Sequence, residues 1–206
     1  EMTHPAFAGA LHGTPGLSKD KVAALTPKLG DGKLGVYVSE KFPFAYDYAD
    51  GDNDAMPAKG PYGSHGTHVA GITAGDADQI VGVAPEAQVI VAKVSRSEDG
   101  DIPDSALLAA LDDMVVLHPD VVNLSLGQLG GMDNEADSVS ATVFKSLQDA
   151  GITVNAAAGN HYSAGYGNLS GKTLPYASDP DSSTQCEPAT YSSVVSVASM
   201  DNLLSY

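Results

Sequence analysis

The chain has 206 residues, of which 43% are apolar, and this is enough for one domain of ordinary size with a hydrophobic core. Its 26 acidic and 10 basic side chains give a formal net charge of −16 at pH 7. This balance argues against binding to nucleic acid and against contact with anionic membrane surfaces, because both need clustered basic side chains.

The first part of the chain predicts little regular structure. Residues 8–35 are rich in glycine, serine and proline, which predicts a long surface loop. The segment around Asp47 also has the character of a loop. The first predicted strand is 88–94, a short apolar run rich in β-branched residues and followed by a charged loop.

A helix and a strand follow. Asp104 or Ser105 can cap the helix at its N-terminus, and Pro119 predicts its end, because proline disfavours helical geometry in the residue before it. The next strand is 121–126. The helix side chains predicted to face inward are Leu107, Leu108, Leu111, Met114 and Val115.

A second helix is predicted at 135–150, with Gly151 as its C-cap. Strands are predicted at 152–158 and 193–200, with a second Gly/Ser/Pro-rich surface loop, 161–192, between them. The helix side chains predicted to face inward are Val139, Val143, Phe144 and Leu147.

The alternation of strands and helices predicts the fold class. Strand, helix, strand, helix, strand implies right-handed crossovers, and these give an α/β fold with a doubly wound parallel sheet flanked by helices. In such a sheet, ligands bind at the carboxyl ends of the strands.

One motif stands before these elements, Gly63-Ser64-His65-Gly66-Thr67-His68-Val69-Ala70-Gly71. We expect His65 at the mouth of a helix, exposed and able to transfer protons. Gly66 would leave room for a substrate beside the ring. Taken alone, His65 is equally compatible with an ordinary surface or core histidine.

Two further motifs lie at predicted strand ends. In Thr153-Val154-Asn155-Ala156-Ala157-Ala158-Gly159-Asn160 a strand of small residues ends on an asparagine, whose amide could donate to an oxyanion. An ordinary Gly-Asn turn is the alternative. In Asp120-Val121-Val122-Asn123-Leu124-Ser125-Leu126-Gly127 a buried strand ends in a small polar tip.

In this order, the three motifs resemble those of the subtilases, the subtilisin-like serine proteases. Further matches are Gly82-Val83-Ala84-Pro85, Val91-Ala92-Lys93-Val94 and the strand at 193–199. The segment Phe44-Ala45-Tyr46-Asp47-Tyr48 is similar to the Gram-positive cell-envelope subtilases, the branch that includes lactocepin and the complement-cleaving peptidases.

The resemblance implies a serine endopeptidase acting on polypeptide substrates, and it assigns roles by position. His65 would be the histidine of an Asp-His-Ser triad, and Asn160 the oxyanion donor. Thr67 and His68 would be structural. The residues implied to bind the substrate are Ser125, Leu126 and Gly127 on one wall of the cleft and Ala157, Ala158 and Gly159 on the other.

Two parts of the family pattern are missing from the sequence. It has neither the Asp-Thr/Ser/Ala-Gly strand of the triad aspartate nor the Gly-Thr-Ser-Met-Ala motif of the nucleophile. Residues 1–206 are therefore expected to be part of a subtilase catalytic domain and inactive alone. Two alternatives stay open: a non-catalytic subtilase relative that binds extended peptides, and an unrelated doubly wound binding domain.

The remaining expectations concern cofactors and location. No cofactor is required, although the resemblance allows a structural calcium ion, for which Asp76 and Asp78 are candidate ligands. The acidic loop 50–54 lacks the ligands of an EF-hand and is expected to be solvated. Cys186, the single cysteine, is expected to be an incidental surface thiol. The family and composition favour an extracellular protein, secreted or anchored to the cell wall.

Overall fold

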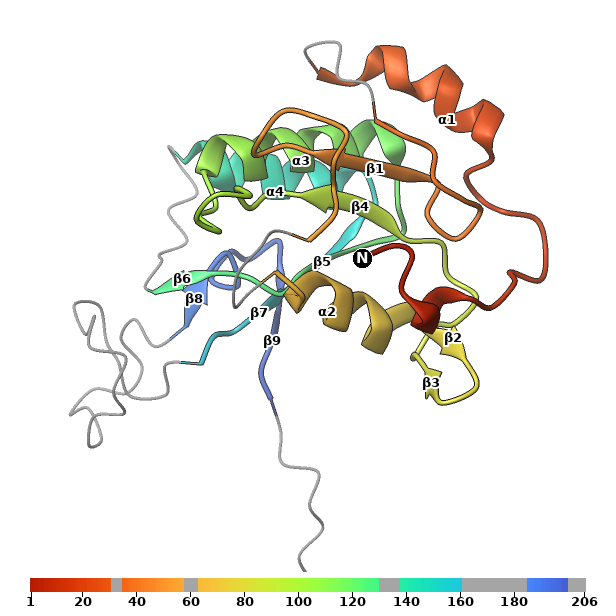
Figure 1. Cartoon of the computed structure of the whole chain (residues 1–206). Coiled ribbons are helices and arrows are strands. Elements are labelled where there is room, and N and C mark those ends of the chain that lie inside the picture. The colour runs from red at the N-terminus through yellow and green to blue at the C-terminus, as the bar shows by residue number, and fades with distance from the viewer. Residues whose placement is uncertain (31–34, 58–62, 130–137, 161–184, 200–206) are drawn as a thin grey trace, which may run out of the picture. The chain divides into compact units, whose positions relative to one another are not determined.

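The computed structural model describes residues 1–30, 35–57, 63–129, 138–160 and 185–199 (Figure 1). The chain divides into two compact units, Glu1–Leu117 and His118–Tyr206. Parallel strand pairs accompanied by helices occur in both units, which agrees with the predicted α/β class.

The first unit is built on a parallel pair of strands, β1 (Phe44–Asp47) and β4 (Ile90–Lys93). All of β1 is buried, so the prediction of a loop around Asp47 was wrong. The Asp47 carboxylate is 1% exposed. It can lie in a buried strand because the Lys93 ammonium pairs with it and the backbone N–H of Ala49 donates to it at 2.9 Å.

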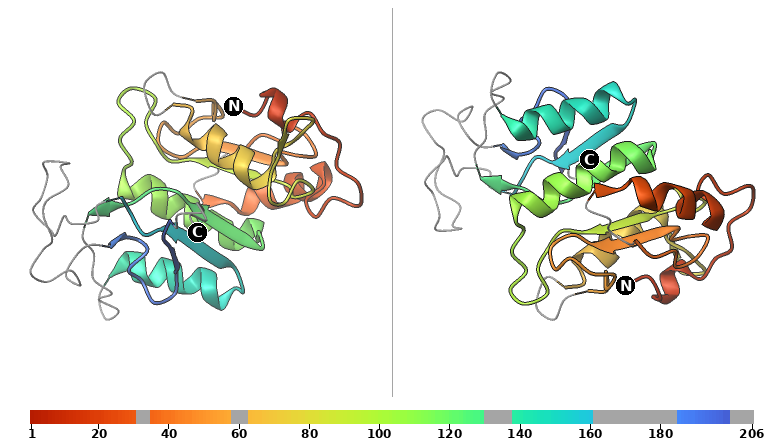
Figure 2. Two further views of the ribbon diagram at one scale, coloured as in Figure 1. Left: turned by 90° about the horizontal axis from the view of Figure 1, so that it is seen from below. Right: turned by 90° about the horizontal axis from the view of Figure 1, so that it is seen from above.

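Helices flank this strand pair, with α2 and α3 on different sides of it (Figures 1 and 2). A short antiparallel hairpin follows α2. The described elements of this unit other than β1 and β4 are the helices α1 (Lys19–Leu25), α2 (His65–Ala74) and α3 (Asp104–Leu117), the hairpin strands β2 (Asp76–Ala77) and β3 (Ile80–Val81), and the 3-10 turns Pro5–Phe7 and Thr26–Lys28.

Helix α1 corrects the prediction of an uninterrupted loop over 8–35. The Ser18 hydroxyl accepts a hydrogen bond from the N–H of Lys21 and so caps the helix. Only Val22 is buried, at 2% exposure. A helix with one inward position shows no apolar periodicity, and the glycines and prolines on both sides of it concealed it further.

Helix α3 ends at Leu117, close to the predicted position. Pro119 excludes helical geometry from His118, which adopts a φ of 54°. Leu111 and Met114 are buried as predicted, whereas Leu107, Leu108 and Val115 are half-buried. The apolar residues of the helix that are buried are Ala106, Ala110, Leu111, Met114 and Leu117.

Asp113 is buried on the same helix, at 2% exposure. Its two carboxylate oxygens accept hydrogen bonds from the Tyr48 hydroxyl and from the Gly30 N–H, both at 2.8 Å. Burial, together with this hydrogen bond to Asp113, raises the pKa of Tyr48. A buried carboxylate is tolerated here because both of its oxygens are hydrogen-bonded.

The second unit contains a parallel sheet in the order β5 (Val121–Leu124), β7 (Thr153–Ala157), β9 (Val195–Val197). Helix α4 (Val139–Asp149) packs against β7 (Figure 2). These strands occur where they were predicted but are shorter, and residue 200 of the last prediction lies outside the described residues. A second pair, β6 (Gln128–Leu129) and β8 (Cys186–Glu187), is antiparallel.

Helix α4 begins after Ser138, whose hydroxyl accepts from the N–H of Ala141, and residues 135–137 of the prediction lie outside the described residues. Gly151 follows the helix with a φ of 80°, which confirms it as the C-terminal cap. Val139 is 69% exposed, contrary to the prediction, because it is the first helical residue and lies off the inner face. The buried residues are Ala141, Phe144 and Leu147.

Candidate active site

Helix α2 begins at His65, and this histidine is exposed. The carbonyl oxygen of Ser64 accepts the first helical hydrogen bond, from the N–H of His68 at 3.0 Å. Among the described residues, and apart from its chain neighbours and the backbone of α2, a Cβ atom at Gly66 would meet no atom within 4 Å. His65 thus occupies the exposed helix start that the sequence predicted, in the first unit.

The other candidate residues belong to the second unit, at the carboxyl ends of β5 and β7. The parallel register places Leu124 opposite Ala156, so residues 125–127, which follow β5, and residues 157–160, which start with the last residue of β7, begin side by side. β7 is extended by two backbone hydrogen bonds of Ala158: its N–H donates to Val197 and its carbonyl accepts from Cys186, both at 2.8 Å. The two predicted walls of a substrate cleft are therefore neighbours within this unit.

Two glycines let a third segment, β8, approach both strand ends. A Cβ atom at Gly127 would lie 2.7 Å from the carbonyl oxygen of Glu187. A Cβ atom at Gly159 would lie 2.3 Å from the Cys186 sulfur, and Gly159 also has a φ of 109°. Larger residues at these two positions would displace β8, which explains why glycine stands there.

Cys186 therefore differs from the prediction of a surface thiol in a loop. It lies in β8 and is 3% exposed, between Gly127 and Gly159. Burial raises the pKa of its thiol, which makes it a poor nucleophile. No pattern in the sequence indicates β8, because a strand of two residues has no periodicity to detect.

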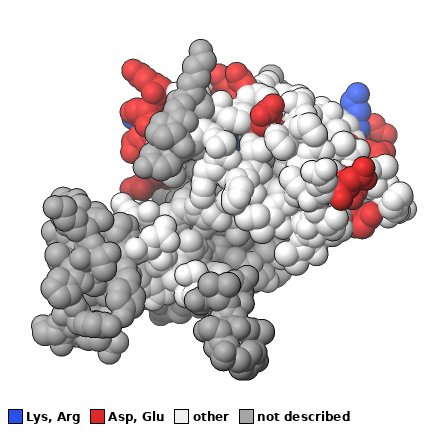
Figure 3. Space-filling model, turned by 60° about the horizontal axis from the view of Figure 1, so that its bottom comes forward, with Lys and Arg blue, Asp and Glu red and all other residues white. Residues whose placement is uncertain are grey.

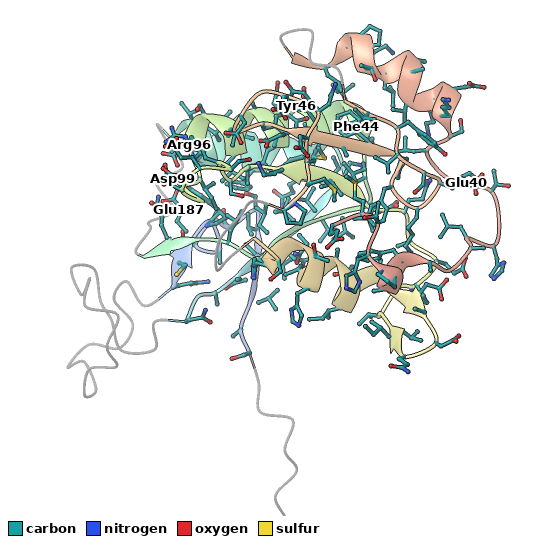
Figure 4. The ribbon with its side chains drawn as sticks, in the orientation of Figure 1. Glu40, Phe44, Tyr46, Arg96, Asp99 and Glu187 are labelled. Carbon is teal, nitrogen blue, oxygen red and sulfur yellow. The ribbon has the colours of Figure 1, made fainter. Side chains whose placement is uncertain are left out.

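Glu187 is the other residue of β8, and the sequence did not indicate a functional role for it. It pairs with Gln128, the residue that follows Gly127, and Figure 4 shows its side chain near β6. One carboxylate oxygen accepts from the Tyr191 hydroxyl, and the other lies 3.4 Å from the amide nitrogen of Gln128. Burial, followed by the hydrogen bond to Glu187, raises the pKa of Tyr191.

A second group of charges lies at the ends of β1 and β4. The Lys93 ammonium contacts Asp47 and lies 3.3 Å from Asp50. Hydrogen bonds from the Ser97 side chain and N–H lower the pKa of the Asp50 carboxyl to about 2. Part of the acidic loop 50–54 is therefore anchored through Asp50 to the loop after β4.

The candidate calcium ligands, Asp76 and Asp78, lie in the hairpin that follows α2. Asp76 lies in β2, with its carboxylate against Gly9, where a Cβ atom would lie 1.8 Å from the Asp76 oxygen. Across the described ranges, no three His, Cys, Asp or Glu side chains are grouped so that they could hold a metal ion. Asp76 and Asp78 are therefore not members of such a group within those ranges. Within the same ranges, no helix is both long and apolar enough to cross a membrane.

Comparison with known proteins decides the family. The family model described as "Subtilase family" matches residues 1–205. This chain is a subtilase. It is 34% identical over 199 residues to the PI-type proteinase of Lactococcus lactis subsp. cremoris, with 90% of the chain and 10% of the proteinase covered. It is 30% identical over 175 residues to the C5a peptidase of Streptococcus pyogenes, with 80% of the chain and 14% of the peptidase covered.

Solved structures support the fold of this subtilase. It is similar to the prenylagaramide maturation protease PagA, with a TM-score of 0.53, 26% identity, and 68% of this chain and 43% of that chain covered. It is also similar to the patellamide maturation protease PatA, with a TM-score of 0.53, 24% identity, and coverage of 72% and 47%. The subtilase chain thus spans between a tenth and a seventh of the two curated relatives and less than half of these structures.

Proposed function

We propose that residues 1–206 are part of the catalytic domain of a subtilisin-like serine endopeptidase that hydrolyses peptide bonds in polypeptide substrates. The observation that carries this proposal is the family match over residues 1–205, which includes the exposed His65 at the start of α2 and the exposed Asn160 after β7. Since the chain covers only about a tenth of the PI-type proteinase, the triad aspartate and serine would belong to other parts of a longer protein.

In this mechanism His65 moves the proton. Its imidazole accepts the proton of the serine hydroxyl as the serine oxygen bonds to the scissile carbonyl carbon. It then gives that proton to the leaving amine when the peptide C–N bond breaks. The exposed position at the start of α2 favours this role, because the ring must reach both the serine and the substrate.

Asn160 would stabilise the charge that develops on the carbonyl oxygen. Its side-chain amide is a neutral donor, and a donor fixed before the reaction needs no reorganisation in the transition state. The φ of 109° at Gly159 favours this role, because it interrupts the extended conformation of β7 immediately before Asn160.

The substrate would lie against the strand ends of the second unit. An extended peptide can pair with the backbone of Ser125, Leu126 and Gly127, as an added strand does. The small side chains of Ala157 and Ala158, with Gly159, would form the opposite wall of the primary specificity pocket. The parallel register of β5 and β7, which makes the two segments neighbours, supports this assignment.

An extracellular protein, secreted or held at the cell wall, is the location that we propose. The two relatives are named as a proteinase and as a C5a peptidase, which suits an enzyme acting on proteins outside the cell. The acidic composition is consistent with this and with polypeptide rather than nucleic-acid partners. Acidic side chains also predominate over Lys and Arg on the face shown in Figure 3.

The decisive test is labelling by a fluorophosphonate, which reacts with activated serines. We expect the longer protein that contains this chain to be labelled, and the His65→Ala variant to lose labelling because the serine is no longer deprotonated. His68→Ala is the matched control, since His68 is also an exposed histidine of α2, and it should still be labelled. The 206-residue chain alone should not react.

A folded longer protein that is not labelled would contradict the proposed chemistry. The better interpretation would then be a non-catalytic subtilase relative that binds extended peptides without cleaving them. Labelling of the 206-residue chain itself would reveal a nucleophile among its own residues and would also contradict the proposal.

A further inference from the structure

Glu187 holds a carboxylate beside one wall of the proposed cleft. In the antiparallel pair β6–β8, Glu187 lies opposite Gln128, and residues directly opposite each other project from the same face of a pair. Gln128 immediately follows Gly127, the last of the three residues proposed to pair with the substrate. The backbone carbonyl of Glu187 lies against Gly127 itself.

The position of this carboxylate is fixed. The Tyr191 hydroxyl donates to one oxygen, and the Gln128 amide nitrogen lies 3.4 Å from the other. Tyr191 is in turn held by the core: it is 5% exposed and its ring stacks on Phe144 of α4, with ring centroids 5.2 Å apart. The side chain of Glu187 is therefore oriented chiefly by Tyr191, which is itself packed, whereas Gln128 is exposed.

The negative charge of Glu187 is not neutralised by these neighbours, because a phenol and an amide are both uncharged donors. In the described part of the second unit, the only Lys or Arg is Lys145, whose ammonium lies 2.9 Å from Asp149 on the outer face of α4. A half-buried carboxylate held by neutral groups keeps its attraction for a cation brought by a ligand.

We propose that Glu187 is a specificity-determining residue, which favours substrates carrying a lysine or arginine side chain next to β6. The inference rests on the proposed function, because it takes 125–127 as the segment that pairs with the peptide. A basic substrate side chain would meet a carboxylate that Tyr191 and Gln128 already orient. Binding would therefore cost little further conformational entropy of the Glu187 side chain.

The test compares matched peptides cleaved by the longer protein. Each peptide carries a single lysine at one of the four residues before the scissile bond, and its partner carries the uncharged norleucine there. At one position at least, we expect Glu187→Gln to lower the ratio of kcat/KM for lysine over norleucine by roughly fivefold to tenfold, as suits a partly solvated charge pair. Cleavage of the norleucine peptides should not change, which also shows that the variant is folded.

Asp120→Asn is the matched control. It removes the same charge from the same unit, but Asp120 precedes β5 and so stands at the opposite end of that strand. Its lysine-to-norleucine ratio should equal that of the wild type. For the wild type the ratio should also fall as salt is raised, because salt screens partly exposed charges, whereas a purely structural role of Glu187 would give no such dependence.

The outcomes separate this inference from the function on which it rests. If Glu187→Gln cleaves both peptide sets as the wild type does, the specificity role is refuted while the endopeptidase stands. If the wild type cleaves no peptide, the proposed chemistry fails, and the same ratio is then measured on peptide binding by fluorescence anisotropy. A Glu187→Gln variant that binds lysine and norleucine peptides with the wild-type ratio refutes the role of Glu187 in that case as well.

Discussion

Asn160 stands directly after Gly159, whose φ of 109° is open to glycine but strained for other residues, and its side chain is exposed. Because the unusual φ belongs to Gly159, a substitution at Asn160 removes the donor without touching the residue that needs glycine. This separation makes the proposed oxyanion role accessible to a clean test.

We expect Asn160→Ala to lower kcat by about 10² to 10³ and to leave KM nearly unchanged, because the amide acts on charge present only in the transition state. Steady-state kinetics of the longer protein check this. Asn53→Ala, in an exposed loop of the first unit, is the control and should have wild-type kinetics. A rise in KM with constant kcat would instead assign Asn160 to substrate binding.

The places of single residues in the fold were predictable from the sequence where a short motif marks them, although their chemical roles stay predictions. His65 and Asn160 stand out because a histidine before a helix and an asparagine after a strand are visible in the chain order itself. Cys186 and Glu187 were not predictable, because their places depend on contacts with Gly127 and Gly159 far away in the sequence. No local pattern records such a contact.

At the scale of elements, the C-terminus of α4 shows how one residue ends a helix. The N–H of Gly151 donates to the carbonyl of Gln148, and the N–H of Ile152 donates to that of Leu147, both at 2.9 Å. These two bonds form a Schellman motif, which requires the left-handed conformation that Gly151 adopts with its φ of 80°. The strand β7 begins at once afterwards.

We expect Gly151→Ala to destabilise α4 by about 1 kcal/mol, the cost of a side chain in the left-handed region. Gly71→Ala, inside α2, is the matched control with the opposite sign. Among the described residues a Cβ atom there meets nothing within 4 Å beyond the backbone of α2, and alanine stabilises a helix interior by roughly 0.5–1 kcal/mol. Amide hydrogen exchange within each helix measures both effects. Equal protection of α4 in Gly151→Ala and wild type would contradict the capping role.

Elements with a clear apolar run or several inward positions were predictable, and elements without either were not. Helices α3 and α4 have several inward positions each, so their apolar periodicity appears in the sequence, and their ends are marked by Pro119 and Gly151. Helix α1 and strand β8 each bury a single side chain, which no period can reveal. The strand ends also shifted, since pairing with neighbours rather than composition sets where a strand stops.

For the whole molecule, the sequence predicted the class of fold but not the division of the chain into two compact units. Alternating strands and helices indicate parallel pairing, yet they do not say which strands become neighbours. In the structure β1 pairs with β4, β7 pairs with both β5 and β9, and the chain divides after Leu117. Pairing is a matter of long-range contacts and loop closure, which a local pattern does not contain.

The buried position of Cys186 allows the opening of β8 in the second unit to be measured by thiol alkylation. A reagent such as iodoacetamide can reach this thiol, the single one in the chain, only after β8 has left Gly127 and Gly159, and burial also suppresses its thiolate form. Its alkylation rate therefore reports the local opening of that unit, in the same way that amide exchange reports local unfolding.

We expect native alkylation of Cys186 to be at least about 10²-fold slower than that of glutathione, which corresponds to an opening free energy of about 3 kcal/mol or more. Urea should abolish the difference. A peptide bound along 125–127 should lower the alkylation rate of Cys186 further, because it adds a strand next to Gly127, against which β8 packs. Alkylation at the glutathione rate in the native protein would mean that β8 is open in solution. The packing of β8 against Gly127 and Gly159 would then form only when a ligand stabilises it.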